Sequence, residues 1–161
     1  MNLIAAVFAA FCLVMSAQAR ADEVVVLRFA FADAPQEFTY IPGRAGMTRF
    51  SMLDAISIEG QAGAARLVVK FALPPDAGPG AQLLDARVTY RPDGFADFWQ
   101  TVDIPAPEAF RFERVVLTGP RPEIAGRFNV ALCPRVSIMR PADLEGCRMA
   151  SGQFATHLQI D

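Results

Sequence analysis

The segments "GRFNVALC" (residues 126–133) and "CRMASGQFATHLQI" (residues 147–160) decide the fold, because they share the pattern Gly-x-Phe-x-x-x-Leu from Gly126 and Gly152. Side chains on a β-strand alternate between its two faces. One face of each segment is therefore largely apolar, and the two sets are Phe128, Val130 and Leu132, and Phe154, Thr156, Leu158 and Ile160. The repeat predicts two similar amphipathic strands that lie side by side, each entered through a flexible glycine.

The same two segments hold Cys133, Cys147 and the only histidine, His157. A structural zinc site needs four ligands, usually from closely spaced pairs, and a blue-copper site needs two histidines. This pair of cysteines has neither, so we expect no metal and no other cofactor. An even number of cysteines in an exported chain instead predicts a Cys133–Cys147 disulfide. His157 is then expected on the solvent side of its strand.

The first 19 residues have the pattern of a secretory signal peptide. They carry no charged side chain, and the apolar run from Leu3 to Met15 is shorter than the roughly 20 residues that span a bilayer. Small residues precede a cleavage point after Ala19, and cleavage after Ala21 is also compatible. We therefore expect a periplasmic or secreted protein with one domain over residues 20–161 and no membrane span after cleavage. An uncleaved N-terminal anchor is the alternative.

The composition excludes one large class of partners. The chain has 161 residues with 15 basic and 17 acidic side chains, and its net charge is −2. It contains no basic run or stripe of the kind that binds nucleic acid.

Clusters of Pro and Gly separate short stretches that are rich in β-branched and aromatic residues, as in "IPGRAG" (41–46) and "RPDG" (91–94). This rhythm predicts an all-β antiparallel β-sandwich of about eight or nine strands, Greek-key or jelly-roll-like, with one disulfide. A single helical turn is expected over 141–146. The expected strands are 23–31, 36–41, 47–59, 65–73, 85–91, 97–104, 110–118, 126–133 and 152–160.

The most suggestive local feature for binding is a group of aromatic and acidic residues, and the candidate ligand-binding residues are Tyr90, Asp93, Phe95, Asp97 and Trp99. Aromatic rings with a polar edge can stack on a sugar or hold a peptide. The competing interpretation is that these rings belong to the core. Alternation places Trp99 on one face with Asp97 and Thr101, which favours partial exposure.

Two functions follow from these patterns. The first is a non-catalytic envelope module that binds a partner protein, a glycan or an apolar ligand, and a purely structural role is not separable from it. The second is a periplasmic hydrolase that uses Asp93, Asp97 or Asp103, since paired carboxylates can catalyse glycoside hydrolysis. The sequence has no Gly-x-Ser-x-Gly nucleophile turn.

Overall fold

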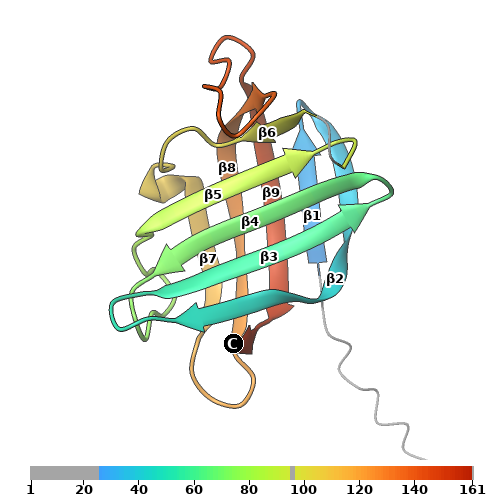
Figure 1. Ribbon diagram of the computed structural model, residues 1–161. Helices are drawn as coiled ribbons and strands as arrows, with labels where there is room; N and C mark the ends of the chain where they lie inside the picture. The colour runs from blue at the N-terminus through green and yellow to red at the C-terminus, as the bar shows by residue number, and fades with distance from the viewer. Residues whose placement is uncertain (1–25, 95–96, 161) are drawn as a thin grey trace, which may run out of the picture.

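A computed structural model describes residues 26–94 and 97–160, which form ten strands and one turn of 3₁₀-helix (Figure 1). The expected signal peptide, both cleavage points and Phe95 lie outside the described residues. The elements are β1 (Val26–Phe31), β2 (Ala34–Arg49), β3 (Asp54–Ala62), β4 (Ala65–Leu73), β5 (Asp85–Arg91), β6 (Phe98–Gln100), η1 (Pro107–Ala109), β7 (Phe110–Val116), β8 (Glu123–Arg135), β9 (Arg148–His157) and β10 (Gln159–Ile160).

Eight of these strands close into a barrel in the order β1-β2-β3-β4-β5-β6-β8-β9, and β9 pairs with β1 to complete the ring. The all-β antiparallel prediction is confirmed, but the sandwich was wrong. Two further strands pair with the ring: β7 lies antiparallel to β8, and β10 forms a short parallel contact with β2.

The barrel closes because one long strand, β2, belongs to both of its halves. Its first residues pair with β1, and the residues from Thr39 onward pair with β3. The register shifts between Tyr40 and Ala45, which is where the sequence predicted a turn at "IPGRAG". An irregularity of this kind bends a strand without ending it. The expected strand 47–59 is divided instead, at the turn of residues 50–53.

Figure 1 shows the two halves as crossing layers, with β3, β4 and β5 in front of β7, β8, β9 and β1. We call these the front sheet and the back sheet. The apolar core lies between them and contains a connected group of aromatic rings. Rings in contact run from Trp99 and Phe31 through Tyr90 and Phe29 to Phe128 and Phe110, and then to Phe71 and Phe154.

The repeated Gly-x-Phe pattern interlocks β8 with β9. Gly126 lies opposite Phe154, and Gly152 lies opposite Phe128. A Cβ at Gly152 would come within 2.4 Å of the Phe128 ring, and one at Gly126 would come within 3.0 Å of the Phe154 ring. The strands are neighbours as predicted, but the glycines make room for rings and neither has a positive φ.

The core faces predicted for residues 126–133 and 152–160 are correct except at Ile160. On β9 and beyond, Phe154 and Leu158 are buried but Ile160 is half exposed, because the chain leaves β9 and pairs with β2. On β7 a register shift between Phe112 and Arg114 brings Val115 into the core.

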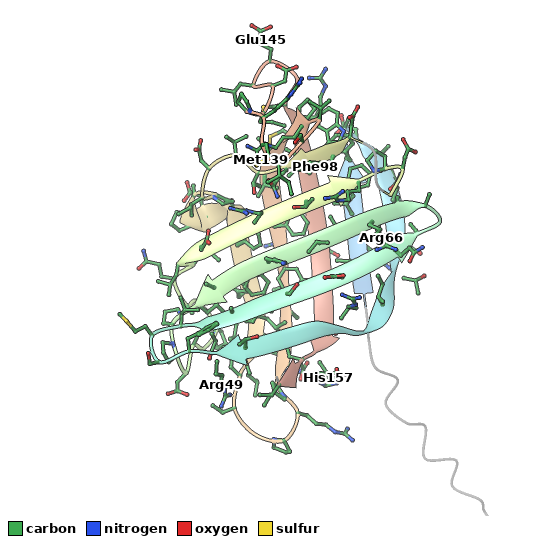
Figure 2. The ribbon with its side chains drawn as sticks, viewed as in Figure 1. Arg49, Arg66, Phe98, Met139, Glu145 and His157 are labelled. Carbon is green, nitrogen blue, oxygen red and sulfur yellow. A yellow bond between two sulfur atoms is a disulfide. The ribbon has the colours of Figure 1, made fainter. Side chains whose placement is uncertain are left out.

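The predicted disulfide joins Cys133 to Cys147. The β8–β9 register ends with Leu132 opposite Arg148, so its next step places the two cysteines opposite each other, with their Cα atoms 4.0 Å apart. The loop that the disulfide closes extends past the end of the barrel, with Glu145 at its tip (Figure 2).

The helical turn expected over 141–146 within this loop is absent. In its place is a non-helical turn in which the Asp143 carboxylate accepts hydrogen bonds from the amides of Glu145 and Gly146.

Substituting Gly152→Ala should lower the free energy of unfolding by about 1–3 kcal/mol, because the new methyl group overlaps the Phe128 ring. Urea unfolding measures this change. Gly78→Ala is the matched control, since a Cβ at Gly78 meets nothing within 4 Å and its φ is not positive. Equal stabilities for the two variants would contradict the interlock.

Replacing both cysteines with alanine should lower the free energy of unfolding by about 3 kcal/mol, the stabilisation expected from closing a loop of this length. Urea unfolding of the native protein with and without reductant should show a similar loss. Reductant should leave the double variant unchanged, and a native protein that is insensitive to reductant would count against the disulfide's role.

Candidate functional site

The two described aromatic residues of the predicted site contact the core. Tyr90 is 5% exposed, and its hydroxyl donates a hydrogen bond to Gln36 Oε1 at 3.2 Å. Trp99 is half-buried, and its ring meets the Phe31 ring edge-on with centroids 4.7 Å apart. Trp99 lies opposite Tyr90, so it shares the inner face with that residue.

The acidic members of the predicted site stand apart from these rings. Asp93, Asp97 and Asp103 are all exposed, and they do not line either of the two hollows described for this structure. Phe95 lies outside the described residues. The hydrolase therefore stays a prediction, and the geometry of the described carboxylates adds nothing to it.

A hollow of about 1060 Å³ lies on the outer face of the back sheet. It extends across the strands from the β1–β2 hairpin, over β9 and β8, to β7 and η1. We call it the back-sheet groove. Its lining combines polar and charged side chains with apolar surface, and it is built mainly from outward-facing positions whose strand neighbours are buried.

Strand register aligns four of the five charged residues of this groove in one row, and the fifth, Glu108, lies in η1. Glu37 lies opposite Arg28, and Arg28 lies opposite Gln153. Gln153 in turn lies opposite Arg127, which lies opposite Arg111. Five strands thus each contribute one side chain to a continuous line.

A second row lies two residues further along each strand, on the same face, and consists of small or uncharged side chains. Asn129 lies opposite Ser151, Ser151 opposite Ala30, and Ala30 opposite Pro35. These short residues leave the middle of the groove hollow and supply amide and hydroxyl groups for hydrogen bonding.

The charged row contains side chains that form ion pairs and one pair of like charges. Arg28 Nε lies 3.5 Å from Glu37 Oε1, and Arg127 Nε lies 4.0 Å from Glu113 Oε1. Exposed pairs such as these contribute little stability. Arg111 and Arg127 face each other directly across two strands, an arrangement of like charges that is destabilising. An anionic group bound between them would relieve this repulsion.

Sequence reasoning missed the back-sheet groove because its residues come from five strands. The available signal was the row of polar residues that alternate with core residues, such as Arg127 beside Phe128 and Gln153 beside Phe154. That signal shows which residues face solvent, but it does not show which strands are neighbours.

His157 lies opposite Glu123, and it is partly buried. Its Nδ1 atom is buried without a hydrogen-bond partner among the described residues. Across residues 26–94 and 97–160, no three side chains of the His, Cys, Asp or Glu type are grouped so that they could hold a metal ion. Within the same residues, no helix has the length and apolar character needed to cross a membrane.

Comparisons with known proteins found no matching family model, no matching curated protein and no matching solved structure.

Substituting Phe31→Ala should expose Trp99, the only tryptophan of the chain, because the ring that covers one of its sides is removed. Its fluorescence should shift to longer wavelength, and acrylamide should quench it more strongly. Phe50→Ala is the control, since Phe50 is 56% exposed in the β2–β3 turn. Unchanged quenching in Phe31→Ala would contradict the packing described for Trp99.

Proposed function

We propose that this protein is an exported, non-catalytic module that binds a carboxylate-bearing glycan strand in the back-sheet groove. The observation that carries the proposal is the row of Arg28, Gln153, Arg127 and Arg111 across the floor of a concave surface.

The chemistry of the groove suits such a ligand. The planar guanidinium group of arginine can bind a carboxylate through two parallel hydrogen bonds. Asn129 and Ser151 lie two residues further along the strands and can hydrogen-bond sugar hydroxyl groups. A purely apolar ligand fits less well, because charged side chains cross the groove and the interior of the barrel is filled by side chains.

Two observations support export. The first 19 residues have the pattern of a cleavable signal, and the Cys133–Cys147 disulfide belongs to a type of bond that persists in oxidising compartments. Both are compatible with a periplasmic or secreted protein, where glycan strands and envelope proteins are available as partners.

Calorimetric titration with trigalacturonic acid tests the proposal, with maltotriose as the uncharged comparison. The native protein should bind only the acidic trisaccharide. The Arg111→Gln/Arg127→Gln double variant should weaken binding at least about tenfold, since each charge-assisted hydrogen bond contributes about 1.5–3 kcal/mol. The Arg121→Gln/Arg140→Gln variant is the matched control, because it removes the same charge from exposed loop positions.

Equal weakening in both double variants would show that net charge, and not the groove, determines binding. Failure of the native protein to bind trigalacturonic acid would refute the proposal that the ligand is an acidic glycan. Binding of hexaglutamate in its place would indicate an acidic peptide as the ligand.

A further inference from the structure

The outer face of the front sheet is strongly basic, although the whole chain is slightly acidic. Alternation along each strand identifies the outward positions, because the residues between them are buried. Among these positions the acidic side chains are Glu59 and Asp85. The basic side chains of this face are Arg66, Lys70, Arg87 and Arg91, and Arg44 of β2 and Arg135 at the end of β8 lie at its margins.

The fold places like charges directly opposite each other on this face. In the β4–β5 register, Lys70 lies opposite Arg87, and Arg66 lies opposite Arg91. Such pairs lower the stability of a sheet. Glu59, on β3, lies 3.8 Å from Arg44 and therefore partners the basic residue at the margin of the face rather than the central pair. The Lys70–Arg87 pair thus keeps a repulsion that an external anionic surface would relieve.

The neutral positions of this face argue for a broad anionic surface and against the core of a protein interface. Ser57 and Thr89 are small and polar, and Val68 is only partly exposed. The large exposed apolar side chains of the described residues all lie outside β3, β4 and β5. Interface cores between proteins are instead enriched in aromatic residues and depleted of charge.

One aromatic ring on this side supports the arrangement of charges. Phe98 faces outward on β6 and is 4% exposed, and the Arg91 guanidinium carbon lies 4.8 Å from its ring centroid. Arg135 donates a hydrogen bond to Gln100 Oε1 at 3.2 Å. These contacts orient Arg91, which lies opposite Arg66, and Arg135, which lies opposite Phe98 further along the sheet. Figure 2 shows Arg66 on the same sheet as Phe98.

We propose that the front sheet docks on the surface of an anionic lipid bilayer, with its arginines and Lys70 against the phosphate groups of the lipids. Basic side chains near such a surface each add to the attraction, and salt screens it. This goes beyond glycan binding, since the back-sheet groove lies on the opposite face of the barrel and would stay open to solvent.

Co-sedimentation of the whole protein with lipid vesicles tests this inference. We expect binding to vesicles of equal parts phosphatidylglycerol and phosphatidylcholine, little binding to pure phosphatidylcholine, and a loss of about tenfold or more in half-molar salt. Lys70→Glu should weaken vesicle binding by about tenfold or more. The same variant should unfold at an equal or higher urea concentration, because an ion pair with Arg87 replaces a repulsion.

Arg121→Glu is the matched control, since it makes the same change of charge at an exposed position in the β7–β8 turn. It should bind vesicles as the native protein does. Absence of binding to phosphatidylglycerol vesicles, or equal weakening by both variants, would overturn the inference. Binding of polyglutamate without binding of vesicles would also overturn it, in favour of an acidic protein partner. Lys70→Glu should still bind trigalacturonic acid as the native protein does, because the back-sheet groove lies on the opposite face. This titration therefore distinguishes failure of the membrane inference from failure of the glycan proposal.

Discussion

The packing of Phe128 on Gly152 and of Phe154 against Gly126 is the contact on which the rest of the structure depends. A slip of one residue between β8 and β9 would move every side chain of a strand to the opposite face. The interlock opposes such a slip, because each ring fits only where its partner has no Cβ. Phe154 also meets Phe71 of the front sheet at 5.6 Å between ring centroids. The same contact thus links the register of the back sheet to its packing against the front sheet.

Both candidate surfaces follow from register. Fixing β8 against β9 aligns Arg127 with Gln153 on the outer side of the back sheet, and it leads the chain to the position where Cys133 meets Cys147. On the other side of the barrel, the pairing of β4 with β5 gathers positive charge around Lys70. A chain with nearly balanced composition therefore presents a mixed-charge groove on one face and a basic sheet on the other. Net charge alone conceals this difference.

Alternation and turn residues were sufficient to predict the bounds of the regular strands, because those bounds depend on the local sequence pattern. The predicted ranges 65–73 and 85–91 coincide with β4 and β5, and the disulfide was predicted from compartment and spacing. Closure of the barrel was not predictable in this way, since a Pro-Gly cluster can bend a strand as well as end it. The inward orientation of Trp99 was not predictable for a related reason: its pairing with Tyr90, which turns the ring inward, is set by a neighbouring strand. The back-sheet groove needs four such pairings at once.

The seam between β1 and β9 has a consequence for how the chain folds. It pairs Val26 with Ala155, so almost the whole chain must be present before the ring can close. Contacts between residues so distant in sequence form slowly. Until they form, β1 and β8 each have an unpaired edge, which is a site where strands of other molecules can add. Aggregation is thus a risk during synthesis and folding, until β9 is inserted and pairs with both of those edges.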